Sequence, residues 1–219
     1  GIVRDISRRK EAEERIEYLN SILNVIRSIN QLIVREPDTN KMLQRAVNIL
    51  VNTRHYVMAW IGKVVSEGGG LQPLASAGLE DGYLSEMLNS KDSPVCLASR
   101  VVREKRTFVA KRISHSSRYT KEGKKAAVER GYLSSVSVPI LSQNEVFGVL
   151  EVYSAREDSF DVQEISLLEE VATDLGFAIA QNEAEKKSRY LSFHDSLTGL
   201  YNRAYFEEEM KRLDRERQL

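Results

Sequence analysis

Residues 131–154 read GYLSSVSVPILSQNEVFGVLEVYS, and the other elements of the chain are arranged around them. Two β-rich runs, residues 133–141 and 146–153, flank the polar residues 142–145. This is the sequence form of a β-hairpin with a four-residue loop. We therefore expect two neighbouring antiparallel strands here.

Each strand of the hairpin has two faces, because successive side chains of a strand point to opposite sides of the sheet. One face is apolar and carries Val136, Val138, Ile140, Gly148, Leu150 and Val152. The other face is mixed and carries Ser135, Ser137, Pro139, Phe147, Val149, Glu151 and Tyr153. We expect the apolar face to pack against helices and the mixed face to look onto something partly polar.

The elements on either side of the hairpin follow from changes in the period of the apolar residues. Helices are predicted at residues 8–35, 39–52, 80–89, 95–105 and 119–130, and from residue 161 past residue 181. Strands are predicted at residues 56–65, 71–77 and 107–109, with Gly68, Gly69 and Gly70 as a turn. Because these strands do not alternate strictly with helices, they predict an α+β fold on an antiparallel sheet. The N- and C-terminal helices would cover one face, and short helices and loops the other.

The first long helix carries apolar residues at intervals of three and four, which is typical of a coiled coil. The predicted dimer seam consists of Ile16, Leu19, Leu23, Ile26 and Asn30. Asn30 either sets the register of the paired helices or is exposed where they splay apart. A second stripe, Ile22, Val25, Ile29 and Leu32, faces the helix's own domain. We expect a homodimer formed through the terminal helices.

Composition excludes several classes of function. The 219 residues include 32 basic and 32 acidic side chains, which gives no overall reason to bind nucleic acid or an anionic membrane. The single cysteine, Cys96, rules out an intramolecular disulfide and a thiolate metal cluster, and it fits a cytoplasmic location. No metal site is predicted, since His55 and His115 have no second ligand at metal-binding spacing. The apolar runs fall far short of the roughly 20 residues that span a bilayer.

Five runs in order resemble the GAF domain family: YVMAWIGKVV, LASAG, GYLSSVSVPI, EVFGVLEVYS and SFDVQEISLLEEVATDLGFAIA. The resemblance covers residues 29–181. It implies a ligand cavity on the mixed face of the sheet, roofed by the short helices. The candidate ligand-binding residues are Trp60, Ser135, Ser137, Glu151 and Tyr153. Glu151 is the most informative, because a buried carboxylate is costly unless a ligand donor or a neighbouring hydroxyl binds it, or it lies exposed at a sheet edge.

The identity of a ligand does not follow from the resemblance. Cyclic-nucleotide-binding GAF domains carry an N-K-x(n)-F-x3-D-E pattern, of which only Phe160 is matched. Leu97 follows Cys96 where bilin-linking cyanobacterial relatives usually have His, and redox-active GAF enzymes need more than one cysteine. We therefore predict no cofactor, but an unidentified small-molecule ligand. The alternative is a GAF domain that binds nothing and serves as a dimerisation spacer.

The two ends of the chain resemble other signalling modules. GIVRDISRRKEAEERI is similar to the last strand and exit helix of a PAS domain, with residues 1–7 as the domain end and residues 8–28 as a signalling helix. HDSLTGLYNRAYFEEEM, within residues 194–219, resembles the opening of a GGDEF domain, and residues 182–193 link it to the GAF domain. The matched GGDEF turn residues are Asp195, Thr198, Asn202 and Arg203. The opposite charges of Asp195 and Arg203 suit an ion pair that fixes this turn.

These resemblances imply a bacterial PAS–GAF–GGDEF protein whose GAF domain relays a signal through dimeric helices to cyclic di-GMP synthesis. The chain itself is expected to be no enzyme, because the metal-binding carboxylates and the GG[DE]EF loop of that family come later than the matched segment. Two-metal phosphoryl transfer needs such carboxylates to hold its ions. The alternative is that the chain is an active diguanylate cyclase.

Overall fold

The computed structural model describes residues 2–65, 70–89, 97–195 and 197–217. Cys96, the start of the helix predicted at residues 95–105, and Gly68 and Gly69 of the predicted turn lie outside the described residues. The chain forms two compact units, Gly1–Phe177 and Ala178–Leu219. The first unit contains the sheet and its helices, and the second contains the end of one long helix, a turn and a final helix.

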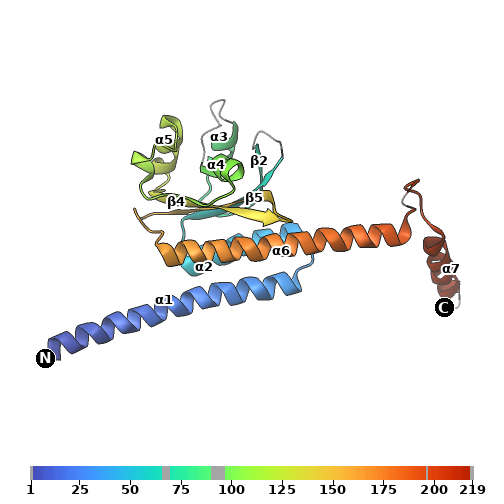
Figure 1. Ribbon diagram of the computed structural model, residues 1–219, viewed down its shortest axis with the longest axis horizontal. Coiled ribbons are helices and arrows are strands. Elements are labelled where there is room, and N and C mark those ends of the chain that lie inside the picture. The colour runs from blue at the N-terminus through green and yellow to red at the C-terminus, as the bar shows by residue number, and fades with distance from the viewer. Residues whose placement is uncertain (1, 66–69, 90–96, 196, 218–219) are drawn as a thin grey trace. The chain divides into compact units, whose positions relative to one another are not determined.

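The first unit is built on a five-stranded antiparallel sheet with the strand order β2-β1-β5-β4-β3 (Figure 1). The strands are β1 (Met58–Val64), β2 (Leu71–Gly78), β3 (Phe108–Ala110), β4 (Ser134–Ser142) and β5 (Glu145–Ser154). The predicted hairpin is the β4–β5 pair, and β5 lies at the centre of the sheet. The predicted α+β fold is confirmed.

The hairpin turn is tighter than predicted. Ser142 pairs with Glu145, so that the loop contains only Gln143 and Asn144 instead of four residues. Both loop residues have left-handed backbone angles, with φ of 52° and 67°. Two consecutive left-handed residues match the right-handed twist of the flanking strands, which allows the strands to pair up to the turn.

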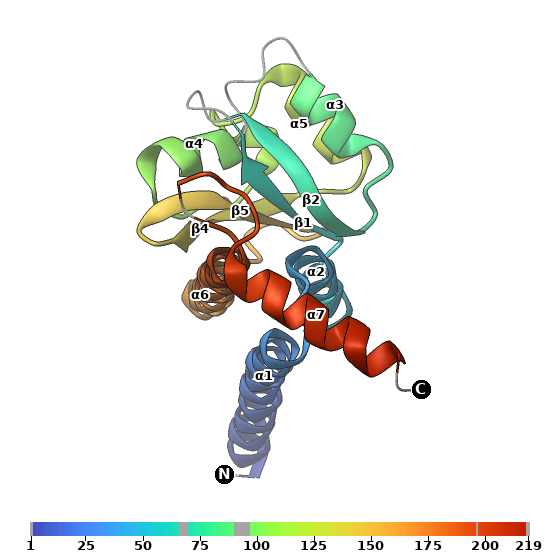
Figure 2. The same cartoon turned by 90° about the vertical axis from the view of Figure 1, so that its right-hand side faces the viewer.

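Helices cover both faces of the sheet (Figures 1 and 2). Along one face lie α2 (Thr39–Arg54) and the first part of α6 (Val162–Phe193), and over the other lie α3 (Tyr83–Asn89), α4 (Leu97–Glu104) and α5 (Lys121–Glu129). A hydrophobic cluster joins Trp60, Val149 and Tyr153 to residues of α3, α4 and α5. The mixed face therefore looks onto the short helices, as predicted.

The apolar face of the hairpin points the other way, because its residues alternate with those of the mixed face. Val136, Val138, Ile140, Leu150 and Val152 are all buried. Helix α6 approaches β4 closely on this side, since a Cβ added to Gly176 would lie 2.1 Å from the carbonyl oxygen of Leu141. Only glycine permits this contact without a shift of the backbone.

Helix α2 begins as predicted. Asp38 is its N-cap and accepts a hydrogen bond from the backbone N–H of Lys41 at 2.9 Å. Such a cap satisfies one of the free amide groups of the first turn. His55 ends the helix in a left-handed conformation and leads directly into β1. A short 3₁₀ helix, η2 (Ile113–His115), follows β3.

Helix α1 (Ile2–Arg35) begins earlier than predicted. Residues 2–7 are helical, whereas a resemblance to the last strand of a PAS domain implied an extended segment there. A strand needs a hydrogen-bonding neighbour, and the described residues offer none at this end of the chain. The second stripe of α1 is buried as predicted, at Val25, Ile29 and Leu32, where the helix packs against α2.

The second unit contains α7 (Arg203–Arg217), which follows a turn after the end of α6. Helix α6 ends at Phe193, and His194 forms an isolated β-bridge with Tyr201 across the turn.

Candidate functional site

The five predicted ligand-binding residues lie together on the sheet face beneath α3, α4 and α5. Glu151 of β5 is directly opposite Trp60 of β1 on one side and Ser137 of β4 on the other. Ser135 pairs with Tyr153 two residues further along the same strands. All five are buried, and only 1% of the surface of Glu151 is exposed. We call these residues, together with Tyr119, the Glu151 cluster.

The Glu151 carboxylate has hydrogen-bond donors on two sides. The indole N–H of Trp60 donates to Oε2 at 3.2 Å, and the Tyr119 hydroxyl donates to Oε1 at 3.5 Å. Tyr119 also shares a 2.7 Å hydrogen bond with Ser135 Oγ. Sequence reasoning missed Tyr119 as a site residue, because the predicted helix at residues 119–130 gave no sign that its first residue turns inward.

Two further hydroxyls of the Glu151 cluster remain unsatisfied. Ser137 Oγ and the Tyr153 hydroxyl are buried close to the carboxylate, yet neither makes a hydrogen bond of normal geometry within the described residues. Buried polar groups are usually hydrogen-bonded, to protein, water or ligand. These two hydroxyls therefore interact with the carboxylate only weakly and have hydrogen-bonding capacity left for a ligand.

Burial dominates the electrostatics of the Glu151 cluster. It raises the pKa of Glu151 to about 7, although the hydroxyls of Ser137 and Tyr153 and the indole of Trp60 favour the charged form. Burial, and then the charge of Glu151, hold the pKa values of Tyr119 and Tyr153 well above their usual range. The carboxyl group can consequently carry either a proton or a charge near neutral pH.

Aromatic rings form the wall of the Glu151 cluster. Tyr153 packs against Tyr83 with ring centroids 5.5 Å apart and against Tyr132 at 4.7 Å. Arg130 crosses this layer, with its guanidinium 5.5 Å from the Tyr83 ring and an ion pair to Glu86 at 3.0 Å. The end of α5 is thereby tied to α3.

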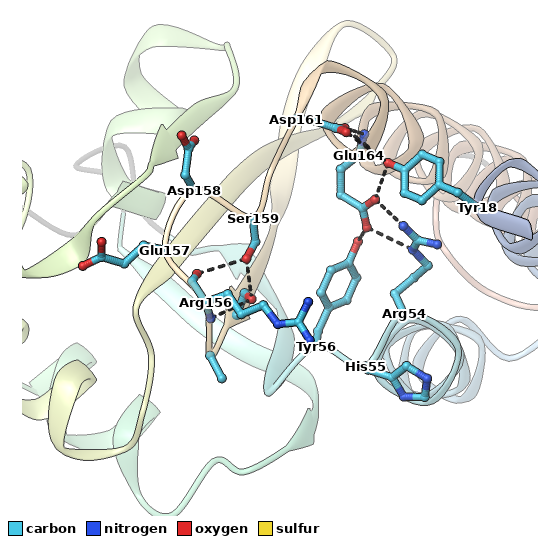
Figure 3. Close-up of a pocket in the computed structure, with 12 residues that line it drawn as sticks. Tyr18, Arg54, His55, Tyr56, Arg156, Glu157, Asp158, Ser159, Asp161 and Glu164 are labelled. Carbon is cyan, nitrogen blue, oxygen red and sulfur yellow. Dashed lines mark hydrogen bonds and ion pairs between the residues drawn. The ribbon is translucent and has the colours of Figure 1, made fainter. Parts of the chain in front are cut away.

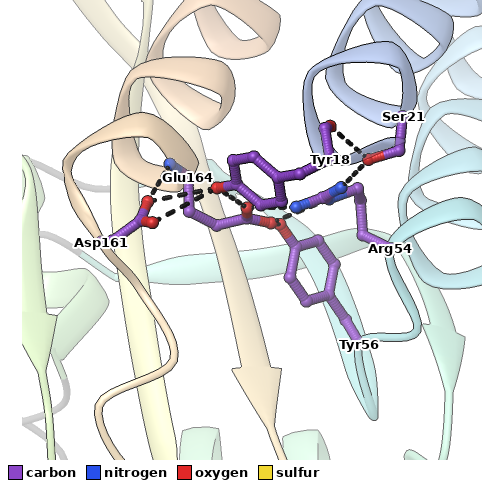
Figure 4. A network of polar contacts seen from close by, with 6 residues as sticks. All are labelled: Tyr18, Ser21, Arg54, Tyr56, Asp161 and Glu164. Carbon is purple, nitrogen blue, oxygen red and sulfur yellow. Dashed lines mark hydrogen bonds and ion pairs between the residues drawn. The ribbon is translucent and has the colours of Figure 1, made fainter. Parts of the chain in front are cut away.

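A second buried carboxylate, Glu164, joins four separate segments near the start of α6 (Figure 4). Arg54 at the end of α2 binds it through two nitrogens, one of them at 3.0 Å, and the Tyr56 hydroxyl also donates to it. Tyr18 of α1 donates to it at 3.0 Å. Only 4% of Glu164 is exposed. We define the Glu164 network as Tyr18, Ser21, Arg54, Tyr56, Asp161 and Glu164.

Asp161 and Ser21 complete the Glu164 network. Asp161 accepts a hydrogen bond from the backbone N–H of Glu164 at 2.8 Å, and it also accepts one from Tyr18 at 3.2 Å. Arg54 donates to Ser21 and lies 5.0 Å from the Tyr18 ring centroid. Burial and the charge of Glu164 raise the pKa of Tyr56 well above its usual range. The network fixes α1 to the domain through charge-assisted hydrogen bonds.

A pocket of about 490 Å³ adjoins the Glu164 network (Figure 3). We call it the side pocket. Its lining residues are Tyr18, Arg54, His55, Tyr56, Ser154, Ala155, Arg156, Glu157, Asp158, Ser159, Asp161 and Glu164. None of the residues of the Glu151 cluster belongs to it. Sequence reasoning missed this pocket and the network, because their residues come from four segments with no shared pattern.

The predicted dimer seam lies largely on the surface of this chain. Ile16, Leu19 and Leu23 are 58%, 41% and 60% exposed, Asn30 is exposed, and Ile26 is half-buried. Three exposed large apolar residues at intervals of three and four give α1 an apolar stripe facing outward. Such a stripe favours association with another helix.

The GGDEF turn residues act differently from the prediction. Asp195 accepts hydrogen bonds from the backbone N–H groups of Leu197 and Thr198 and from the Thr198 hydroxyl. Asn202 caps α7 by accepting from the backbone N–H of Tyr205 at 3.1 Å. The predicted ion pair between Asp195 and Arg203 is wrong, since Arg203 pairs with Glu207 one helical turn on at 2.7 Å. Asp195 instead satisfies nearby backbone amides, as Asp commonly does in turns.

Within the described residues, no three His, Cys, Asp or Glu side chains converge in a way that would hold a metal ion.

The described helices include none with the length and apolarity needed to cross a membrane.

The comparisons with known proteins agree with the fold. The family model described as GAF domain matches residues 36–180. The chain is similar to the crystal structure of the GAF domain from an Acinetobacter phosphoenolpyruvate-protein phosphotransferase, at 20% identity and a TM-score of 0.60. That match covers 76% of this chain and 97% of the other. A comparison with curated proteins gave no match.

Two further structures are similar at low sequence identity. One is a domain of a putative two-component sensor histidine kinase from Sinorhizobium meliloti, at 18% identity and a TM-score of 0.56, covering 68% of this chain and 95% of that one. The other is a phycocyanobilin-bound GAF domain from a cyanobacterial phytochrome, at 18% identity and a TM-score of 0.59, covering 75% and 96%. At these identities the likeness concerns the fold.

Proposed function

Because the chain belongs to the GAF domain family, we propose that it is a sensor in which a small molecule bound at the Glu151 cluster controls the terminal helices. GAF domains are typical of sensory and regulatory signalling proteins. The observation that carries the proposal is the buried Glu151 carboxylate, flanked by the unsatisfied hydroxyls of Ser137 and Tyr153. Converging polar groups within an otherwise apolar layer are what a small-molecule site requires.

The proposed signal travels from the sheet to the helices. Trp60, which binds Glu151, lies on β1 four residues after Tyr56, which binds Glu164. Strand β5, which carries Glu151, leads into α6 through the segment that contains Asp161. A ligand that moves β1 or β5 would therefore change the contacts that hold α1 and α6 together. The ligand can shift the equilibrium between two arrangements of the helices only by as much as its affinity differs between them.

The proposed output lies in a larger signalling protein. The sequence between His194 and Met210 resembles the start of a GGDEF domain, and residues 1–7 resemble the end of a PAS domain. We therefore propose a bacterial PAS–GAF–GGDEF protein in which paired terminal helices relay the signal to cyclic di-GMP synthesis. A cytoplasmic location accords with this proposal, because GTP, the substrate of that synthesis, is an intracellular nucleotide.

The chain by itself is proposed to lack cyclase activity. Its 219 residues contain no GG[DE]EF sequence, and the family's metal-binding carboxylates would follow the matched segment. An assay with GTP and Mg²⁺ tests this directly. Formation of cyclic di-GMP by the 219-residue chain would contradict the proposal.

Native mass spectrometry of freshly purified chain tests the sensor function. We expect a retained small molecule in the wild type and its loss in Glu151→Gln, because the neutral amide cannot offer a ligand donor the same charge. Glu145→Gln is the matched control, since Glu145 begins the same strand but is exposed. Equal retention by Glu151→Gln and the wild type would place the molecule elsewhere.

A second function is favoured by the packing above Glu151. The rings of Tyr83, Tyr132 and Tyr153 contact one another directly, which suits a domain that binds nothing and serves as a dimerisation spacer. Complete absence of a retained molecule, together with unchanged output of the full-length protein when Glu151 is replaced by Gln, would support the spacer over the sensor.

A further inference from the structure

The side pocket is large enough to hold a small molecule and is separate from the Glu151 cluster. Its volume of about 490 Å³ falls within the roughly 300–1,000 Å³ that is usual for ligand sites. Residues from α1, the α2–β1 junction, the β5–α6 loop and the start of α6 line it (Figure 3). The Glu164 network holds these segments together, and most of its residues belong to the pocket lining.

Every acidic side chain that lines the side pocket already has a partner. Glu164 binds Arg54, and Asp161 caps α6 and accepts from Tyr18. Glu157 pairs with Arg112 at 3.0 Å, and Asp158 pairs with Lys111 at 2.9 Å. The negative charges of the four carboxylates are therefore compensated by groups of the protein, so that the pocket has no free carboxylate to bind a cation.

Two basic side chains of the pocket remain free. Within the described part of the chain, the Arg156 guanidinium and the His55 imidazole make no hydrogen bond or ion pair, and both residues are exposed. Figure 3 shows the Arg156 side chain reaching across the pocket toward Tyr56. His55 is held at the pocket by the backbone, because it ends α2 in a left-handed conformation with φ of 55°.

Hydroxyl groups lie beside these bases. Ser154 and Ser159 share a hydrogen bond of 2.9 Å between their Oγ atoms, and both line the pocket. Ser159 also donates to the backbone carbonyl of Arg156 at 3.0 Å, and Ser154 accepts from the backbone N–H of Arg156 at 3.2 Å, so that the two hydroxyls hold the Arg156 backbone in place. The groups available to a ligand are thus a guanidinium and an imidazole, which are hydrogen-bond donors suited to an oxyanion.

We propose that the side pocket is a second ligand site and that it binds a small organic anion through a carboxylate or phosphate group. Arg156 binds two oxygens of that group through its planar fork, and His55 donates a further hydrogen bond. The rest of the molecule occupies the pocket beside Tyr18 and Tyr56. The bound anion contacts residues that hold α1 to α2 and α6, so it acts on the terminal helices without passing through the sheet.

Isothermal titration calorimetry of the 219-residue chain with inorganic phosphate and, separately, with succinate tests this site. We expect saturable binding of at least one probe, and the probe that binds tells a phosphate ligand from a carboxylate ligand. Arg156→Gln should weaken that binding at least roughly 10-fold, because it removes a charge-assisted, two-point contact. Arg103→Gln is the matched control, since Arg103 is an exposed arginine of α4 that does not line the pocket, and its partner Glu104 keeps ion pairs to Arg100 and Arg106.

A second variant keeps the test independent of Arg156. His55→Asn removes the imidazole but retains a residue type that tolerates the left-handed conformation, and it should also weaken binding. No saturable binding of either probe below about 10 mM would overturn the proposal. Equal binding by Arg156→Gln and Arg103→Gln would overturn it too, as would loss of binding in Glu151→Gln alone, which would assign the anion to the Glu151 cluster.

Discussion

Trp60 and Glu151 face each other across the β1–β5 pair, and the indole N–H of Trp60 donates a hydrogen bond to the Glu151 carboxylate at 3.2 Å. This contact lies at the centre of the sheet and beneath the short helices. The Trp60 indole and the more distant Tyr119 hydroxyl, at 3.5 Å, are both neutral donors, and they do not replace the hydration that the carboxylate loses on burial. For this reason the folded protein holds a proton on Glu151 more tightly than the unfolded chain does.

Glu151 makes stability depend on pH. Its pKa is raised from 4.5 to about 7 in the folded state. The contribution of Glu151 to the free energy of unfolding is therefore largest below pH 4.5 and falls as the pH rises from 4.5 to 7. The total loss is on the order of 3 kcal/mol, and above pH 7 it does not increase further. Glu151→Gln stays neutral throughout, so we expect it to be more stable than the wild type at pH 8 but not at pH 5.

Urea unfolding followed by circular dichroism at pH 5, 6, 7 and 8 checks this prediction. Subtracting the unfolding free energy of Glu151→Gln from that of the wild type at each pH removes the contribution of other titrating groups. Glu104 is one of these, since hydrogen bonds from Arg106 and Arg100 lower its pKa in both proteins. A difference in unfolding free energy that is constant over these pH values would show that Glu151 does not titrate in this window.

Glu164→Gln tests the Glu164 network. The variant leaves the buried guanidinium of Arg54 without a counter-charge, and removal of one member of a buried ion pair costs about 3–5 kcal/mol. Asp158→Asn is the control, because Asp158 and its partner Lys111 are both exposed and the loss should stay within about 1 kcal/mol. Urea unfolding at pH 7 measures both variants. Similar losses in the two would mean that burial does not strengthen the Arg54–Glu164 pair.

The fold and the inner cluster could be predicted from the sequence because strands alternate with a period of two. Once the hairpin was recognised, that period placed Ser137 and Glu151 on one face and Val136 and Leu150 on the other. A single error of register would have exchanged the two faces. The length of the turn was not predicted, because four consecutive polar residues are typical of a longer loop. In the structure only two of the four, Gln143 and Asn144, have left-handed backbone angles.

The Glu164 network could not be predicted, because nothing in the local sequence marks it. Tyr18, Arg54 and Glu164 are separated by tens of residues, and each stands where a polar residue is ordinary in a helix. Glu164 lies in the first turn of α6, where an acidic residue already suits the helix dipole. Their meeting is a consequence of how α1, α2 and α6 pack, which requires the three-dimensional fold.

The hairpin turn offers a stabilising change. Gln143 and Asn144 both have positive φ, and the dipeptide Asn-Gly is preferred in such turns. The double variant Gln143→Asn with Asn144→Gly should raise the free energy of unfolding by roughly 0.5–1 kcal/mol, because it removes left-handed strain from the folded state. Urea unfolding measures the change. A loss of stability instead would mean that the side chains of Gln143 and Asn144 make contacts that outweigh this strain.

The dimer seam of α1 predicts the state of association. Leu23 is 60% exposed in the single chain and would be buried in a paired helix, so Leu23→Asn should raise the dimer dissociation constant at least roughly 100-fold, since each copy loses a buried leucine. Val34→Asn is the control, because Val34 is 86% exposed but lies off the seam. Light scattering at micromolar concentration distinguishes dimer from monomer. A monomeric wild type, or equal dissociation of the two variants, would show that this stripe does not pair the helices, and the relay through a dimeric bundle would then be wrong.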